Sequence, residues 1–303
     1  MTKNFYSNGK LLLSGEYAIL DGAKGLAVPT KFGQSLNVTE EDSAMLHWKS
    51  IDEKGNIWFE GRYELLSFAE VSSSDAKISK TLIAILRQAK GLNPKFLVEP
   101  GGLRVETKLT FSQNWGLGTS STLINNIAQW SGVDPYALLA KTFGGSGYDI
   151  ACAQNDSPVL FWLEDSRPKT KVVHYDPPFK DRLFFIHLNK KQNSREGIAD
   201  YRKKHFDQIE LINSLSDVSL QLLKCKKLNL FEELISKHED LLSRALNLKP
   251  VGEKLFSDYS GAIKSLGAWG GDFILATGDN RTPDYFKEKG YETIIPYSQM
   301  VLS

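Results

Sequence analysis

Two glycines followed by four hydroxyl residues stand near the middle of the chain, and apolar residues at 123, 124, 127 and 128 follow them with helical spacing. Glycine lets the backbone approach a ligand closely, the first N–H groups of a helix have no helical partners, and the helix dipole there favours negative charge. The stretch therefore predicts a phosphate-binding loop that begins a helix over residues 119–130. Its residues are Asn114, Trp115, Gly116, Leu117, Gly118, Thr119, Ser120, Ser121 and Thr122.

An ordinary glycine turn with a Ser or Thr N-cap is the alternative interpretation of this loop. One cap uses one hydroxyl, whereas a nucleotide with its metal can use several, so the four hydroxyls favour phosphate binding. The loop does not match three common templates. It lacks the Lys of a Walker sequence, Ser121 stands where the dinucleotide fingerprint has its third glycine, and the signatures of protein kinases are absent from the sequence.

Three further segments combine glycine with charged or hydroxyl residues. Residues 10–16 place Lys10 and Glu16 at the two ends of an apolar run, although an edge strand with an exposed Lys and Glu would look the same. Residues 144–151 carry Asp149, which could also be a simple helix N-cap. Residues 267–272 contain three glycines and end in an aspartate.

The hydrophobic pattern predicts the strands and helices that must position these segments. Period-two alternation and turn residues predict strands in hairpins between residues 31 and 66, and over 95–99, 103–111, 183–188, 273–277 and 291–295. Helical periodicity predicts helices over residues 76–90, after an Asp75 N-cap, and over 196–224, 228–246, 251–265 and 282–289.

Length and composition limit the class of protein. With 303 residues and 41% hydrophobic content, the chain can form two moderate cores. Composition loosens between residues 165 and 178, so we expect an N-terminal domain over 1–170 and a C-terminal domain over 171–303. Because 37 basic residues nearly balance 36 acidic ones, we expect neither nucleic acid nor a membrane as a partner. No apolar run resembles a signal peptide or a membrane span, which predicts a cytoplasmic protein.

The segments at residues 10–16, 116–121 and 267–272 together resemble, in order and rough spacing, the three motifs of the GHMP kinases, which are the galactose, homoserine, mevalonate and phosphomevalonate kinases. The resemblance spans nearly the whole chain and is closest to the mevalonate and phosphomevalonate branch. Residues 144–151 are similar to the Ser-Gly-x-Asp-x-Ala motif of that branch and to a subgroup with a Gly-Tyr-Asp-Ile-Ala string.

The resemblance implies an α+β protein with the two-domain GHMP kinase fold, an S5-like N-terminal α/β domain and a ferredoxin-like C-terminal α+β domain. It implies ATP and Mg²⁺ as cofactors, and a small acceptor with a hydroxyl or phosphate group, with mevalonate or phosphomevalonate as the first choices. It also implies a monomer or a homodimer. Two alternatives stay open, a diphosphomevalonate decarboxylase and a nucleotide-binding homologue with little turnover.

The resemblance also implies roles for individual residues. Asp149 would deprotonate the acceptor, and Lys10 beside it would keep that carboxylate ionised and stabilise the transferred phosphoryl group. Ser120 would hold the metal. The other cofactor-binding residues would be Asn114, Gly116, Leu117, Gly118, Thr119 and Ser121. The substrate-binding residues would be Glu16, Ser146, Gly147, Gly267, Gly270, Gly271 and Arg195.

Three departures from the family pattern bear on the site. The helix over residues 136–142 lacks the glutamate that serves the mevalonate branch as a second metal ligand, so metal binding would depend on Ser120, the phosphates and water. Trp269 replaces a small residue of the third motif, which predicts a narrower pocket there. Asp272 makes this motif more similar to phosphomevalonate kinases than to mevalonate kinases.

Overall fold

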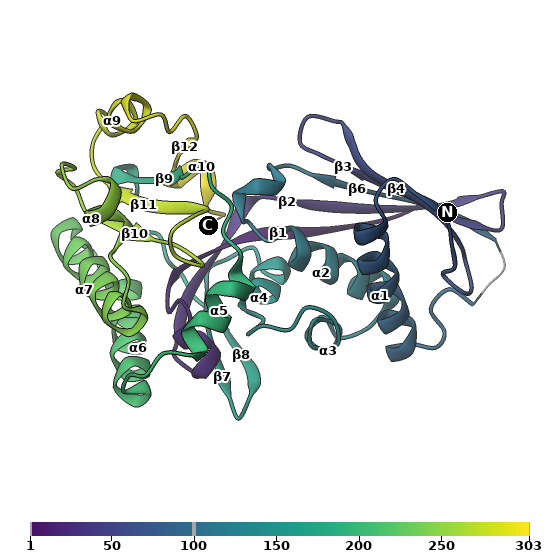
Figure 1. The fold of residues 1–303 in the computed structure, drawn as a ribbon, viewed down its shortest axis with the longest axis horizontal. Coiled ribbons are helices and arrows are strands. Elements are labelled where there is room, and N and C mark those ends of the chain that lie inside the picture. Colours follow the sequence, from purple (N-terminus) through teal and green to yellow (C-terminus); the bar gives the residue numbers. More distant parts are fainter. Residues whose placement is uncertain (1, 99–100, 303) are drawn as a thin grey trace. The chain divides into compact units, whose positions relative to one another are not determined.

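A computed structural model describes residues 2–98 and 101–302 (Figure 1). The chain forms two compact units, and each is made of separated segments. The first comprises Met1–Gly9, Phe32–Gln113 and Leu117–Gln154, and the second comprises Lys10–Lys31, Asn114–Gly116 and Asn155–Ser303. These units are not consecutive stretches, so they differ from the domains 1–170 and 171–303 expected above, and that consecutive division stays a prediction.

A mixed sheet is the frame of the first unit. Its strands alternate between buried apolar and exposed polar residues, which is the pattern of a sheet with one covered face. The long strands β1 (Thr2–Ser14) and β2 (Gly25–Glu41) pair with each other and extend into both units. From residue 34 onward β2 pairs with β6, β6 runs parallel to β3, and β3 pairs with β4 and β4 with β5. The bounds are β3 Met45–Ile51, β4 Ile57–Glu64, β5 Glu70–Ser73 and β6 Gly102–Leu109.

Helices cover the apolar face of this sheet (Figure 1). Asp75 begins the first helix by accepting hydrogen bonds from the N–H groups of Lys77 and Ile78, as expected from the sequence. Buried residues such as Trp48 from the sheet and Leu86 and Ile127 from the helices share one core. The bounds are α1 Ala76–Leu92, α2 Thr119–Ser131, α3 Pro135–Ala140 and α4 Tyr148–Gln154.

The second unit contains a four-stranded antiparallel sheet in the order β10-β11-β9-β12. Its central strands β9 (Leu183–His187) and β11 (Phe273–Thr277) are buried throughout, and β10 (Ile263–Ser265) and β12 (Ile294–Pro296) flank them. A hairpin of β7 (Val159–Glu164) and β8 (Arg167–Val172) pairs with residues 25–27 of β2. The helices are α5 Ser194–Arg202, α6 Gln208–Lys224, α7 Leu228–Leu246, α8 Val251–Leu255, α9 Thr282–Glu288 and α10 Tyr297–Met300, with short 3-10 turns at Ala18–Asp21, Gln113–Trp115 and Lys180–Arg182.

Most elements lie where the sequence predicts them, and α7 and β11 have the predicted bounds. The single helix expected over 196–224 is wrong, because Asp207 accepts a hydrogen bond from the N–H of Glu210 and begins a separate helix. The helix expected over 251–265 stops at Leu255 and gives way to β10. The strand expected over 95–99 is a turn at residues 95–97, and residue 99 lies outside the described residues. Within residues 2–98 and 101–302, none of the helices is both long and apolar enough to cross a membrane.

Candidate active site

The glycine loop begins α2 without a side-chain cap. Gly116 and Gly118 have φ values of 68° and 95°, the left-handed region that glycine adopts without strain, and Gly118 is the N-cap residue. The hydroxyls of Ser121 and Thr122 lie 2.9 and 3.1 Å from the carbonyl oxygen of Gly118. Because no Ser or Thr side chain caps the helix, the simple N-cap interpretation does not explain the row of hydroxyls.

Two of the four hydroxyls are left for a ligand. Ser120 is exposed and Thr119 is half-buried, and neither side chain makes a hydrogen bond to the rest of the chain that the structure describes. Both lie in the first turn of α2, which contains no acidic residue. The free N–H groups and the dipole of this helix end favour an anion, and the two hydroxyls add polar groups beside it.

The first half of the loop is fastened to the small sheet of the second unit. Asn189 donates its N–H to Nδ1 of His187 at 3.3 Å, so the ring proton resides on Nε2, which donates to the carbonyl oxygen of Asn114 at 3.0 Å. The ring of Trp115 meets Phe273 edge-on at 5.7 Å between centroids. His187 and Phe273 belong to β9 and β11, and no motif in the sequence marks either residue as part of the site.

Lys10 binds the loop itself. Its Nζ donates a hydrogen bond of 2.8 Å to the carbonyl oxygen of Gly116, so the ammonium lies at the first glycine. Asp149 belongs to the first unit and Lys10 to the second, and their expected pairing stays a prediction. Asp149 is half-buried in the first turn of α4, where its Oδ1 lies 3.2 Å from the N–H of Ile150. It is therefore inside the helix and is not the N-cap that the alternative interpretation required.

The helix that carries Asp149, α4, packs against α2 within the first unit. Asn125 of α2 donates to the carbonyl oxygen of Ala153 in α4 at 3.3 Å, so the two helices that carry the hydroxyls and the carboxylate are neighbours within the first unit. Ser146 is buried, and Gly147 has a φ of 92°. A Cβ at Gly147 would lie 3.0 Å from the ring of Tyr136, which explains why glycine stands there.

The third glycine segment brings a carboxylate to the loop. A Cβ placed on Gly116 would lie 2.4 Å from Cγ and Oδ2 of Asp272, so the Asp272 carboxylate packs against this glycine. Asp272 itself has a φ of 52°, which costs free energy for a non-glycine residue, and its Oδ1 accepts the N–H of Gln192 at 3.1 Å. Burial raises the pKa of Asp272, while the Gln192 N–H and the nearby Lys10 oppose that rise.

Trp269 does not narrow a pocket, so that expectation is wrong. Its side chain is 5% exposed and packs in a core cluster with Tyr17 and Tyr201. Gly267 and Gly270 have φ values of 63° and 91°, and a Cβ at either would meet no atom within 4 Å. These glycines therefore provide the turn and leave open space on that side of the segment, whereas a Cβ at Gly271 would lie 2.8 Å from the carbonyl oxygen of Lys190.

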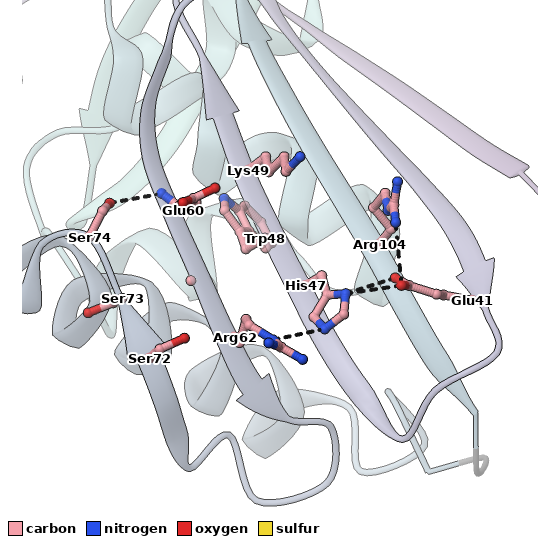
Figure 2. A pocket seen from close by; sticks show the side chains of 11 residues that line it. Glu41, His47, Trp48, Lys49, Glu60, Arg62, Ser72, Ser73, Ser74 and Arg104 are labelled. Atoms are coloured by element: carbon pink, nitrogen blue, oxygen red, sulfur yellow. Dashed lines mark hydrogen bonds and ion pairs between the residues drawn. The ribbon is translucent and has the colours of Figure 1, made fainter.

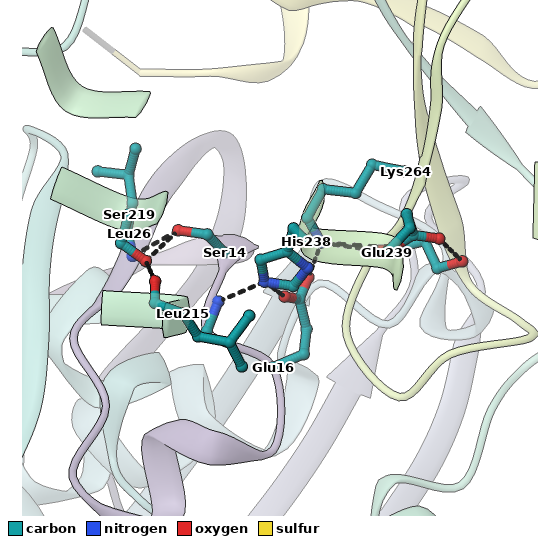
Figure 3. Close-up of polar contacts among 10 residues, drawn as sticks. Ser14, Glu16, Leu26, Leu215, Ser219, His238, Glu239 and Lys264 are labelled. Atoms are coloured by element: carbon teal, nitrogen blue, oxygen red, sulfur yellow. Dashed lines mark hydrogen bonds and ion pairs between the residues drawn. The ribbon is translucent and has the colours of Figure 1, made fainter. Parts of the chain in front are cut away.

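Glu16 has buried partners in place of an acceptor (Figure 3). Its side chain is 1% exposed, Oε1 lies 2.6 Å from Nζ of Lys264, and Oε2 lies 3.0 Å from Nε2 of His238. Burial raises the pKa of Glu16, but Lys264 and His238 outweigh this, and the pKa falls below its ordinary value. These contacts hold Glu16 within the fold, and its expected contact with the acceptor stays a prediction. Arg195, in contrast, is exposed in the first turn of α5.

A pocket of about 540 Å³ lies on the open face of the first sheet, and its lining includes none of the residues predicted for the active site (Figure 2). Its charges compensate one another: Nε of Arg62 donates to Nε2 of His47 at 3.3 Å, and Nδ1 of His47 and a nitrogen of Arg104 lie 3.0 and 3.4 Å from Glu41. The pocket is therefore a row of paired, solvated charges on an uncovered sheet, and we assign no ligand to it.

Comparison with solved structures identifies the fold. The chain is similar to mevalonate kinase from Methanococcus jannaschii, with 15% identity, a TM-score of 0.69 and coverage of 96% of this chain and 94% of that one. It is similar to Streptococcus pneumoniae phosphomevalonate kinase in complex with phosphomevalonate and AMPPNP, with 15% identity, a TM-score of 0.69 and coverage of 95% of each chain. For Lactococcus lactis galactokinase complexed with galactose the identity is 14%, the TM-score 0.64 and the coverage 95% of this chain and 88% of that one. No protein-family model and no curated protein matches the sequence. The chain has the fold of the GHMP kinases, and the expected α+β class is confirmed.

Proposed function

We propose that this protein is a small-molecule kinase that transfers the γ-phosphoryl group of ATP to a hydroxyl or phosphate group of a small acceptor. The observation that carries the proposal is the glycine loop, in which left-handed Gly116 and Gly118 open α2 and leave the hydroxyls of Thr119 and Ser120 uncommitted. The fold shared with small-molecule kinases adds support. Phosphoryl transfer needs mainly positioning and charge neutralisation, which the N–H groups of the helix N-terminus and the ammonium of Lys10 would supply.

The residues around the loop suit a nucleotide carried with Mg²⁺. Within the described residues, no group of three or more His, Cys, Asp or Glu side chains could hold a metal alone. Mg²⁺ prefers oxygen ligands, keeps several waters and often binds through substrate phosphates, so the exposed hydroxyl of Ser120 beside a bound triphosphate fits its demands. When bound, the ion neutralises charge on the phosphates. The loop N–H groups would orient the triphosphate, and Lys10 would hold the loop in place.

Asp149 is our candidate for the general base. Removing the proton from an acceptor hydroxyl requires a carboxylate within hydrogen-bond reach, and the first turn of α4 offers one on a helix that packs against α2. An acceptor that is already a phosphate needs cations more than a base, and exposed Arg195 is a candidate for that task. Mevalonate and phosphomevalonate are the first acceptors to test, because kinases for both share the fold.

The test is ADP release from ATP and Mg²⁺ with mevalonate, phosphomevalonate, diphosphomevalonate, homoserine and galactose assayed in parallel, together with calorimetric titration of ATP. We expect nucleotide binding that requires Mg²⁺ for full affinity and turnover with one acceptor. Release of CO₂ with diphosphomevalonate would identify a decarboxylase instead. Absence of nucleotide binding would refute the proposal.

A further inference from the structure

The two oxygens of the Asp272 carboxylate differ in their hydrogen bonding. Oδ1 accepts the N–H of Gln192 at 3.1 Å, while the backbone N–H of Asp272 donates to the carbonyl oxygen of Lys190 at 2.7 Å. Oδ2 receives no hydrogen bond from the described residues, and it faces the space in which a Cβ of Gly116 would lie, 2.4 Å from that position. One oxygen therefore fixes the turn at residues 190–192, and the other is presented to the glycine loop.

An open carboxylate oxygen at a phosphate loop needs a cation. A phosphate bound at Gly116 would lie close to Asp272, and two anions repel unless a positive charge lies between them. The ammonium of Lys10 already donates to the carbonyl oxygen of Gly116. A hard divalent cation accepts carboxylate and phosphate oxygens together, which is how Mg²⁺ is commonly held in nucleotide sites. The sequence of α3, residues 135–140, contains no carboxylate that could take this task.

We propose that Oδ2 of Asp272 is a ligand of the Mg²⁺ that accompanies the nucleotide in this site. The inference rests on the proposed function. It supplies a carboxylate ligand for Mg²⁺, because residues 114–122 of the glycine loop contain none. The left-handed φ values of 52° at Asp272 and 47° at Trp269 agree with this role. Such backbone costs free energy at a non-glycine residue, and strained residues of this kind are concentrated at ligand sites, where they hold a side chain in one position.

The decisive variant is Asp272→Asn, which keeps an acceptor for the Gln192 N–H and removes the charge. Calorimetric titration of AMPPNP would be done with wild type and variant, each with Mg²⁺ and with EDTA, and Mn²⁺ binding to the AMPPNP complex would be followed by electron paramagnetic resonance. We expect Mn²⁺ affinity to fall about tenfold or more in the variant. Affinity for AMPPNP in EDTA should stay equal or rise, because a repulsive charge is gone. Asp258→Asn, which changes an exposed carboxylate paired with Lys289, is the matched control and should leave both values unchanged.

The outcomes separate this inference from the proposed function. If wild type binds no nucleotide, the proposed function fails and the inference fails with it. If wild type binds AMPPNP but the variant keeps the wild-type response to Mg²⁺, or loses affinity equally with and without the ion, then Asp272 is only a structural residue and this inference alone is overturned. Should Asp272→Asn not fold, Asp272→Glu replaces it. That variant retains the charge but displaces the oxygens, and it should lower Mn²⁺ affinity with little change in EDTA.

Discussion

Two carboxylates of the second unit, Glu16 and Asp272, each directly follow a glycine in the sequence, yet their surroundings differ. Glu16 is 1% exposed, and both its oxygens lie within 3.0 Å of a buried nitrogen, of Lys264 or of His238. Asp272 is only partly buried and leaves Oδ2 open toward the glycine loop. The first carboxylate is committed to the fold, and the second is available to a ligand.

The difference shows that the contacts of a carboxylate in a glycine-rich motif determine its role more than its position in the motif does. His238 of α7 is one of the residues that hold Glu16 within the fold. Its Nε2 lies 2.9 Å from the backbone nitrogen of Gly15 and 3.0 Å from Oε2 of Glu16, so the ring holds residues 15 and 16 in place. Burial lowers the pKa of His238, and the nearby Glu16 carboxylate opposes this. The glycine loop shows the opposite arrangement, with free hydroxyls at Thr119 and Ser120.

Among the residues proposed to contact a ligand, we expect Asp149→Asn to have the largest effect on activity. The amide has nearly the shape of the carboxylate but is no base, so kcat with a hydroxyl acceptor should fall by about a thousandfold, within the range of general-base contributions. Affinity for ATP and Mg²⁺ should change little. Single-turnover ADP formation and a nucleotide titration measure the two quantities, with Asp134→Asn, a helix cap, as the control. Undiminished activity would remove Asp149 from the chemistry.

On the structural side, Glu16→Gln should lower the free energy of unfolding by about 3–5 kcal/mol, because it removes the negative charge that lies 2.6 Å from the buried ammonium of Lys264. Urea denaturation followed by circular dichroism measures this change. Glu53→Gln, at an exposed turn, should stay within about 0.5 kcal/mol of wild type. The double variant Glu16→Gln with Lys264→Met should recover part of the loss.

The result for Glu16→Gln also tests the comparison itself. If the variant kept its stability and instead raised KM for the acceptor, Glu16 would belong with the ligand-facing residues, as the sequence first suggested. The contrast with Asp272 would then be lost.

A smaller effect concerns pH. Burial raises the pKa of Glu239 to about 7, with Lys264 and Ser265 opposing that rise. The folded state therefore binds this proton more strongly than the unfolded chain, so the contribution of Glu239 is complete below its ordinary pKa and is lost as pH rises through about 7. The loss should reach about 3 kcal/mol. The lowered pKa of Glu16 acts in the opposite direction, at more acidic pH.

The variant Glu239→Gln isolates this contribution, because it keeps an acceptor for Ser265 and does not titrate. Unfolding free energies of wild type and variant would be compared from pH 5 to pH 8. Wild type should lose stability relative to the variant as the pH rises. A constant difference between the two proteins would show that the Glu239 carboxyl has no unusual pKa.

The sequence predicted elements and caps correctly where the deciding residues are close together in the chain. The row of glycines and hydroxyls predicted α2 to within a residue of its end, and Asp75 was identified as a cap from its own neighbours. It was insufficient where partners come from distant parts of the chain. Glu16 is neutralised by Lys264, 248 residues away, and His187 reaches Asn114 across 73 residues. Trp269 was misjudged because the sequence does not show which side of a strained turn faces the core.

The smallest effect is expected from Ser120→Ala, which tests a side chain proposed to bind the ligand and not to stabilise the fold. Its hydroxyl makes no hydrogen bond within the described residues, so removing it should leave the unfolding free energy within about 0.5 kcal/mol of wild type. Affinity for ATP with Mg²⁺ should fall several-fold, to about tenfold, while affinity in EDTA stays the same. Ser121→Ala is the matched control on the next residue: its hydroxyl bonds to the carbonyl oxygen of Gly118, so stability should fall and the response to Mg²⁺ should not. If both serines behaved alike, the hydroxyls of α2 would serve the helix and not a metal nucleotide.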